Sequence, residues 1–227
     1  MYVVEPSPTV AVPVTTGGEF PVRRIYCVGR NYRAHAIEMG ADPDREAPFF
    51  FTKPSDAIVA NGATIPYPAR TEDYQHEIEL VVAIGKAGAA IAVGQALDHV
   101  FGYAVGLDMT RRDLQMIARN AGRPWDMGKA FDHSAPCAAI SPVGQVGHLA
   151  NGAISLEING EVRQASDVSL LIWNVAETIA DLSTYVALQP GDLIYTGTPE
   201  GVGPVRRGDH LVGKVAGLTD LVVDIAR

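Results

Sequence analysis

Two glutamates two positions apart, Glu77 and Glu79, are the residues of this sequence whose spacing most suggests chemistry. They begin the mainly apolar segment 77–84, which Gly85 follows and which predicts a β-strand. Because successive side chains of a strand point to opposite faces, both carboxylates lie on one face. Neighbouring carboxylates repel each other, which water tolerates but burial does not, unless a cation lies between them. The pair alone favours the simpler interpretation, an amphipathic strand with a solvated acidic face.

Asp108 is a third carboxylate that follows an apolar segment. Residues 101–107 are too apolar for a surface strand, and an acid at the end of a buried strand either points into a site or caps the next helix, which begins near Arg111. If Asp108 joins Glu77 and Glu79, three oxygen ligands without His or Cys favour a hard cation such as Mg²⁺, Mn²⁺ or Ca²⁺ over zinc.

A histidine and a lysine are further candidates for a site. His35 and Glu38 lie three positions apart on a predicted short helix, residues 31–39, so their side chains can meet. A histidine held by a carboxylate serves as a general base near neutral pH. The simpler interpretation is a surface ion pair, which contributes little to stability. Lys129 has apolar neighbours in the sequence, so its ammonium group either extends to solvent or reaches an anion in a site.

The composition of the 227 residues excludes several classes of protein. Apolar residues make up 47% and charged residues 19%, which excludes a disordered chain, and no continuous apolar run approaches the ~20 residues that cross a bilayer. The net charge of −8 without a basic stripe argues against nucleic acid or an anionic membrane surface as partner. Cys27 and Cys137 are predicted to be unpaired thiols, and the N-terminus lacks the pattern of a secretory signal, so we expect a cytoplasmic protein. The sequence contains no P-loop, GxGxxG, GxSxG or CxxC motif, which disfavours nucleotide binding, serine hydrolysis and thiol redox chemistry.

The hydrophobic pattern predicts short strands and irregular helices without regular alternation, which is typical of the α+β class. Prolines at positions 6, 8 and 13 indicate an extended N-terminal arm, residues 1–20, ahead of a single domain over 21–227. Asn159-Gly160 between apolar flanks predicts a tight hairpin, and the last 20 residues predict a strand pair with a turn near Gly217. The other predicted strands are 22–29, 47–52, 77–84, 101–107 and 192–195, and the other predicted helices are 31–39, 96–100, 111–120 and 169–188.

Six segments, taken in chain order, resemble the fumarylacetoacetate hydrolase family. Each segment alone is a weak signal, but six in the right order are a specific one, and the likeness extends over nearly everything from about residue 21 onward. The segments are 26–32 (YCVGRNY) with His35 and Glu38, 51–54 (FTKP), 76–80 (HEIEL), 106–110 (GLDMT), 129–132 (KAFD) and 190–199 (PGDLIYTGTP).

The resemblance implies a mixed β-roll with short peripheral helices, a homodimer, and one Mg²⁺ or Mn²⁺ ion per subunit. It also places the histidine and glutamate of the predicted short helix on a mobile lid. An arginine, Arg30, Arg33 or Arg112, is expected to receive a distal carboxylate of the substrate. By role, the resemblance assigns the metal to Glu77, Glu79 and Asp108, catalysis to His35, Glu38 and Lys129, and substrate binding to Arg112, Gln115 and Thr198. Arg30, next to the predicted short helix, is a further candidate for substrate binding.

Within the family, the segments FPVRRIYCVGRNYRAHAIEMG and PFFFTKP are most similar to members that hydrolyse fumarylpyruvate in gentisate degradation. The expected reaction is metal-dependent hydrolysis of a carbon–carbon bond in a 2,4-dioxo acid (an acylpyruvate). The metal would chelate the C1 carboxylate and C2 oxygen, His35 would activate water for attack at C4, and Lys129 would stabilise the oxyanion. Decarboxylation of oxaloacetate, and hydration or isomerisation of a 2-oxo acid, use the same chelation and are alternatives. A non-catalytic metal- or ligand-binding module is a further alternative, and it predicts no metal-dependent turnover.

Overall fold

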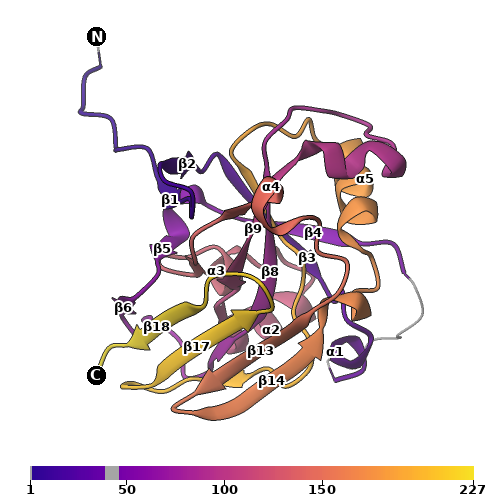
Figure 1. Cartoon of the computed structure of the whole chain (residues 1–227). Helices are drawn as coiled ribbons and strands as arrows, with labels where there is room; N and C mark the ends of the chain where they lie inside the picture. Colours follow the sequence, from indigo (N-terminus) through magenta and orange to yellow (C-terminus); the bar gives the residue numbers. More distant parts are fainter. Residues whose placement is uncertain (1, 39–45) are drawn as a thin grey trace.

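The computed structural model describes residues 2–38 and 46–227, and most strands within these ranges belong to two sheets that lie against each other (Figure 1). The larger sheet is mixed, with strand order β4-β3-β15-β8-β9-β11-β5 and with β12 paired to β9, and the smaller has the order β14-β13-β17-β18-β6. The strands of the larger sheet are β3 (Arg24–Gly29), β4 (Phe49–Lys53), β5 (Ile58–Ala60), β8 (Ile78–Ile84), β9 (Val100–Leu107), β11 (Ala135–Cys137), β12 (Ser141–Pro142) and β15 (Asp192–Tyr195). Those of the smaller sheet are β6 (Ala63–Ile65), β13 (Ala153–Ile158), β14 (Glu161–Asp167), β17 (His210–Val215) and β18 (Leu221–Ile225).

Two small sheets complete the strand pairing in the described ranges. Strands β1 (Ala11–Pro13) and β2 (Glu19–Pro21) form a hairpin near the N-terminus, and β7 (Tyr74–His76) lies between β10 (Thr110–Arg111) and β16 (Gly203–Pro204). The second of these sheets matters for function, because it joins the segments immediately before β8 and immediately after β9.

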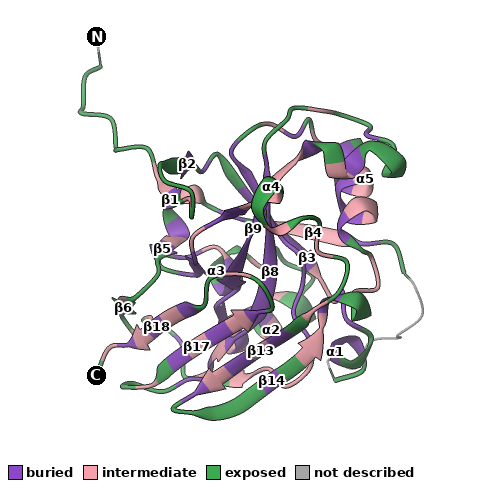
Figure 2. Ribbon diagram, viewed as in Figure 1, coloured by how far each residue is buried: buried purple, intermediate pink, exposed green. Residues whose placement is uncertain are grey.

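Strand β8 lies in the middle of the larger sheet and is buried along its whole length (Figure 2). Its side chains alternate between two cores. Leu80 and Val82 pack in the main core, which the two sheets share, whereas Val81 and Ala83 pack in a second core on the opposite face. By the same alternation Glu79 lies on the face of the second core, and the burial of β8 on both faces carries this carboxylate out of contact with water.

The helices are short and lie at the periphery of the sheets, as Figure 1 shows for α5 and α1. Helix α2 confirms the helix predicted over 111–120, and the 3₁₀ helix η2 replaces the short helix predicted over 96–100. The helices are α1 (Arg33–Glu38), α2 (Arg112–Asn120), α3 (Asp126–Lys129), α4 (Val143–Val146) and α5 (Val175–Tyr185), with 3₁₀ helices η1 (Ser55–Ala57), η2 (Val93–His99) and η3 (Val168–Leu170).

The long helix predicted over 169–188 is wrong at both ends. Helix α5 begins only after Asn174, whose side chain accepts a hydrogen bond from the N–H of Glu177 while the Glu177 carboxylate accepts one from the N–H of Asn174. This reciprocal capping box stops the helix from extending toward its N-terminus. At the other end Val186 is already extended, so the three–four apolar spacing continued beyond the true helix. The end predicted for the helix over 31–39 lies outside the described residues.

The arm predicted over residues 1–20 is not extended throughout its described part, residues 2–20. The hairpin β1–β2 pairs Val12 with Phe20 and buries both side chains in the second core. Gly17 and Gly18 turn the chain between the two strands with φ of 98° and 82°, values that glycine adopts without strain. Only the segment before β1 projects away from the molecule in Figure 1.

Three smaller expectations are confirmed. Asn159 and Gly160 adopt positive φ angles of 54° and 81° between β13 and β14, as a two-residue hairpin requires. The predicted C-terminal strand pair is β17–β18. Cys27 and Cys137 are free and buried. Among the described residues, no helix has the length and apolar character to cross a membrane.

Candidate metal centre and active site

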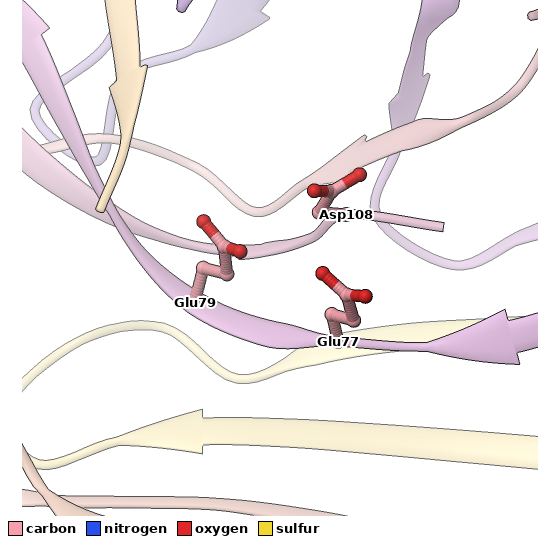
Figure 3. A group of neighbouring side chains, drawn as sticks. All are labelled: Glu77, Glu79 and Asp108. Atoms are coloured by element: carbon pink, nitrogen blue, oxygen red, sulfur yellow. The ribbon is translucent and has the colours of Figure 1, made fainter. Parts of the chain in front are cut away.

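Three buried carboxylates meet where β8 and β9 run side by side (Figure 3). Glu77 lies in the one-residue gap between β7 and β8, Glu79 belongs to β8, and Asp108 directly follows β9. The N–H of Asp108 donates to the carbonyl of Glu77 (2.9 Å), so the antiparallel pairing itself brings the carboxylates together. Each residue offers an oxygen within 4.8 Å of the others, and their exposed fractions are 5%, 1% and 1%.

Burial decides between the two interpretations of each acid. The solvated acidic face expected from the glutamate pair alone is wrong, since Glu77 and Glu79 are buried. The capping role considered for Asp108 is wrong as well, because the N-cap residue of α2 is Arg111 and no side-chain hydrogen bond caps the helix. Asp108 instead lies beside the two glutamates, with an oxygen of each residue within 4.8 Å of the others (Figure 3).

Three cationic side chains surround this carboxylate group. The ammonium of Lys129 donates to Glu77 Oε2 (2.8 Å) and to Asp108 Oδ2 (2.7 Å), and Arg112 Nη2 pairs with Glu77 Oε1. Lys53 Nζ lies 2.8 Å from Asp108 Oδ1 and donates to the carbonyl of Met109 (3.1 Å). The interpretation in which Lys129 extends to solvent is therefore wrong. Its pKa is raised: burial lowers it, but the neighbouring Asp108 and Glu77 carboxylates outweigh that effect.

The carboxylates retain capacity for a cation in spite of these partners. Asp108 Oδ1 lies 2.8 Å from the Lys53 ammonium but accepts no hydrogen bond from the described residues. The pKa of Glu79 is raised well above its usual range by burial and by the Asp108 and Glu77 charges, although the N–H of Gly197 donates to Glu79 Oε2 (2.8 Å). A divalent cation would relieve both features. Oxygen-only ligands fit Mg²⁺ or Mn²⁺, as expected from the sequence.

Glu77 behaves differently from Glu79. Burial raises the pKa of its carboxyl, but Lys129, Arg112 and His35 more than reverse this, so the pKa lies far below the usual range. The neighbouring cations thus favour the ionised form of Glu77, whereas burial and the neighbouring carboxylates disfavour the ionised form of Glu79.

The predicted dyad is formed on α1. His35 Nδ1 lies 3.1 Å from Glu38 Oε2, and His35 is 5% exposed. Because a carboxylate only accepts, Nδ1 carries the proton of the neutral ring and Nε2 keeps its lone pair. Glu38 Oε1 in turn accepts from the N–H of Gly201 (3.2 Å), which anchors the dyad to the loop after β15. With His35 buried, the pair is not an ordinary surface ion pair.

One pocket gathers nearly all the predicted site residues. Glu38 and Asp108 are not in its lining. Glu38 is paired with His35, which is in the lining, and Asp108 lies beside the lining residues Glu77 and Glu79. The predicted residues in the lining are Arg30, His35, Glu77, Glu79, Arg112, Gln115, Lys129 and Thr198.

Sequence reasoning missed several residues of the site. Lys53 is 3% exposed and holds Asp108; like Asp108, it is a charged residue that ends an apolar strand, so the same signal was present. Arg119 lines the pocket and follows Arg112 and Gln115 at helical spacing of three and four, which places the three side chains on one face of α2. The aromatic lining gave no such signal, since its members also fit a plain core: Phe49, Phe51 and Trp125.

Known proteins are similar to this chain in sequence and in fold. The family model for the fumarylacetoacetate (FAA) hydrolase C-terminal domain matches residues 24–226. A fumarylpyruvate hydrolase of Ralstonia sp is 52% identical over 189 residues, which cover 82% of this chain and 98% of that protein. An oxaloacetate tautomerase of Arabidopsis thaliana mitochondria is 39% identical over 204 residues, covering 90% of this chain and 91% of that protein.

A solved structure extends the likeness to the whole fold. The crystal structure of fumarylpyruvate hydrolase from Pseudomonas aeruginosa, in complex with Mn²⁺ and pyruvate, has a TM-score of 0.98 and 55% sequence identity, and the match covers 100% of this chain and 99% of that chain. The α+β class and the mixed β-roll expected from the sequence are confirmed. The Mn²⁺ of that protein agrees with the cation that the three carboxylates of this chain fit.

Proposed function

The chain belongs to the fumarylacetoacetate hydrolase family, and from this premise we propose that it is a metal-dependent hydrolase that cleaves fumarylpyruvate to fumarate and pyruvate. The observation that carries the proposal is that His35, which is buried and paired with Glu38, lines the same pocket as Glu77 and Glu79 of the three-carboxylate group that fits Mg²⁺ or Mn²⁺. The fumarylpyruvate hydrolases at 52% and 55% identity support the choice of substrate.

A divalent cation held by Glu77, Glu79 and Asp108 supplies a Lewis acid that orients a 2-oxo acid and stabilises negative charge on its oxygens. The protein itself contributes further polar groups to the lining of the pocket. Thr198 and Gln115 line the pocket with hydrogen-bonding groups, and both are buried, which fixes their positions before a substrate enters.

The dyad performs the proton transfers. His35, with its Nδ1 proton on Glu38, takes a proton from water at Nε2, and the water oxygen forms a bond to C4 of the substrate. The Lys129 ammonium lines the pocket and stabilises the oxyanion that develops at C4. The C3–C4 bond then breaks, its electron pair remains with C3 as a pyruvate enolate, and protonation at C3 by the imidazolium of His35 restores the neutral ring. The acid formed at C4 releases its proton to solvent, so the products are fumarate, pyruvate and one proton, and one water is consumed.

The distal carboxylate of a fumaryl group requires a cation. Arg112 is committed to Gln75, Gln115 and Glu77, whereas Arg33 lines a different pocket. Arg30 lies over the ring of Phe49 at 4.9 Å and lines the pocket together with Arg119, an exposed residue of α2. We therefore assign the distal carboxylate to Arg30 and Arg119.

A second candidate function is supported by the oxaloacetate tautomerase at 39% identity. Oxaloacetate presents the same C1 carboxylate and C2 oxygen to the cation, so its tautomerisation or decarboxylation would use the same chelation by the metal without attack by water. Hydration or isomerisation of another 2-oxo acid would likewise use the metal and the dyad.

We also propose the setting in which the enzyme works. The predicted single domain over 21–227 would assemble as a homodimer in the cytoplasm and serve gentisate degradation. Two buried free thiols, Cys27 and Cys137, agree with a reducing compartment. Light scattering of the purified chain tests the dimer, and a mass corresponding to one chain would reject it.

The test of function offers fumarylpyruvate, maleylpyruvate, acetylpyruvate and oxaloacetate separately to the purified protein with Mg²⁺ or Mn²⁺. Enol absorbance gives the rate, chromatography identifies the products, and a chelator provides the control. We expect fumarate and pyruvate from fumarylpyruvate, lost on chelation. Turnover of oxaloacetate alone would instead support the second candidate, and metal-independent or absent turnover of all four would reject both.

A further inference from the structure

Gln164 is a buried polar residue on a strand that is otherwise turned toward solvent. It lies in β14, an edge strand of the smaller sheet, and is 1% exposed, whereas the residues on either side of it are exposed. The pairing of β14 with β13 shifts between Leu156 and Glu157, so that Arg163 is an extra residue and Gln164 stands opposite Leu156. Such a bulge re-aims a side chain. Here it directs an amide, rather than the guanidinium of Arg163, toward the interior.

The Gln164 amide uses its full hydrogen-bonding capacity. Oε1 accepts from the N–H of Ile78 (3.1 Å) and lies 2.9 Å from His76 Nδ1. Nε2 donates to the carbonyl of Pro199 (2.9 Å) and to Thr198 Oγ1 (2.9 Å). Because a backbone N–H can only donate and a backbone carbonyl can only accept, Ile78 and Pro199 fix which end of the amide is oxygen and which is nitrogen.

This orientation determines the polarity of the hydrogen bond to Thr198. Since Gln164 donates, the Thr198 hydroxyl oxygen is the acceptor, and its own proton is directed elsewhere. Thr198 is 2% exposed and lines the pocket of the carboxylates. Within the described ranges no protein acceptor is recorded for this proton, so it is available to an oxygen of a ligand in the pocket.

The bulge in β14 also packs against the loop after β15, which carries Thr198 and contacts Glu38. Gly201 packs so closely on the carbonyl of Arg163, at the bulge, that a Cβ would clash, and its φ of 88° also requires glycine. The N–H of Gly201 donates to Glu38 of the dyad. Gln164 thus touches the backbone between Glu77 and Glu79 on one side and, on the other, the loop that presents Thr198 and anchors Glu38.

We propose that Gln164 is a positioning residue that makes the Thr198 hydroxyl an obligatory donor to a carboxylate or carbonyl oxygen of the bound 2-oxo acid. The identity of that acid rests on the proposed function, but the hydrogen-bond polarity does not. Gln164 itself does not touch substrate. Its effect passes through Thr198, so removing either residue costs the same hydrogen bond.

A double-mutant cycle on ligand binding tests this. Calorimetry measures the affinity of pyruvate for the Mn²⁺-loaded wild type, Thr198→Val, Gln164→Met and the double variant. A hydrogen bond to a charged acceptor corresponds to about tenfold in affinity or more. We expect each single variant to bind pyruvate about tenfold more weakly and the double variant to be little weaker than either. Thr198→Ser, which keeps the hydroxyl, should bind like the wild type, as should Val162→Ala, an exposed control on the same strand.

Additive losses in the double variant, or wild-type affinity in Gln164→Met, would overturn the proposal. If Gln164→Met does not fold, Gln164→Glu serves in the same cycle, because it keeps an oxygen that accepts from Ile78. A protonated glutamate side chain at this position has one proton for two acceptors and an ionised one has none, so Thr198 or Pro199 loses its donor in both cases. Pyruvate binding also separates this proposal from the proposed function. Failure of the wild type to hydrolyse fumarylpyruvate would reject the function, whereas the binding cycle would still decide the role of Gln164.

Discussion

The two walls of the pocket are built in opposite ways. The metal wall consists of three carboxylates and three cations from β4, β8, α2, α3 and the segments around them, and each of these six residues is at most 7% exposed. The wall that carries the dyad is the six-residue helix α1, where the Glu38 side chain is 37% exposed and its described link to the rest of the site is the hydrogen bond from Gly201.

The difference follows from what each wall must do. A buried group of like charges needs fixed counter-charges, because leaving one of them unpaired in a low-dielectric interior is costly. A general base needs only a correct tautomer and access to water, which a short helix with one carboxylate can provide. Short helices have little stability of their own, so α1 depends on its contacts with the rest of the protein. We infer that the metal wall determines binding and the dyad determines the rate of chemistry.

The largest effect is expected at the centre of the metal wall. Asp108→Asn should weaken Mn²⁺ binding at least about 100-fold and lower kcat/KM by about 10³, since it replaces a charged carboxylate ligand with a neutral amide. It should also lower the Tm, because Lys53 and Lys129 lose the charge of their buried partner, and breaking a buried ion pair lowers the free energy of unfolding by about 3–5 kcal/mol. Calorimetry and thermal unfolding measure both. Asp132→Asn, an exposed acid near Lys129, is the control; equal behaviour of the two variants would contradict the metal assignment.

A smaller effect is expected in the dyad wall. Glu38→Gln keeps an oxygen that accepts the Nδ1 proton of His35 but loses the charge that stabilises the imidazolium. The expected loss in kcat is roughly tenfold to 100-fold, less than the 10²–10⁴-fold cost typical of removing a base, and Mn²⁺ affinity should not change. Steady-state kinetics with a parallel metal titration checks this, and weakened metal binding would show that the two walls are not separable.

The mouth of the pocket should show a specificity effect of several-fold to about tenfold. Arg119→Met is expected to raise KM for fumarylpyruvate but not for acetylpyruvate, which lacks the distal carboxylate, because an exposed charge pair contributes only modestly. Arg123→Met, a basic neighbour that is not in the lining of this pocket, is the matched control. An equal rise of KM for both substrates would remove Arg119 from distal carboxylate binding.

The smallest expected effect is a pH dependence that comes from the Glu79 carboxyl. The raised pKa of Glu79 in the metal-free protein means that the folded state keeps a proton that the unfolded state releases above its ordinary pKa. The metal-free protein should therefore lose stability as pH rises from that ordinary value toward the raised one, and Mn²⁺ affinity should increase over the same window.

Mn²⁺ binding at pH 6 should accordingly release up to about one proton, measured by calorimetry in two buffers of different ionisation enthalpy. Glu79→Gln should abolish the release. Glu77→Gln should keep it, because the pKa of Glu77 is already lowered. Proton release that survives in Glu79→Gln would assign the titration to another group.

The local sequence pattern predicted only part of the metal wall. Period-two alternation placed Glu77 and Glu79 on one face, but the burial that makes them ligands comes from β8 lying between β15 and β9. The cations could not be assigned from spacing, because Lys53 pairs with Asp108 across 55 positions and Lys129 with Glu77 across 52. Such partners are set by sheet topology, and the family resemblance supplied Lys129 but not Lys53.

Elements whose ends depend on capping or on distant pairing were also hard to predict. The apolar spacing around α5 continued past the Asn174 cap, and the N-terminal hairpin was hidden by prolines although Gly17-Gly18 marked its turn. Gln164 gave no signal at all, because a bulge decides that it faces inward. By contrast, the dyad spacing of three and the Asn159-Gly160 turn are local features, and both were found in the structure as predicted.

The most direct test of the division between the walls is one variant, His35→Asn, measured in two ways. Mn²⁺ affinity is determined by calorimetry and the hydrolysis of fumarylpyruvate by product analysis, each beside the wild type. We predict Mn²⁺ binding within about twofold of the wild type while kcat falls by roughly 10²–10⁴. Turnover close to that of the wild type, or a loss of Mn²⁺ affinity in proportion to the loss of rate, would contradict the account.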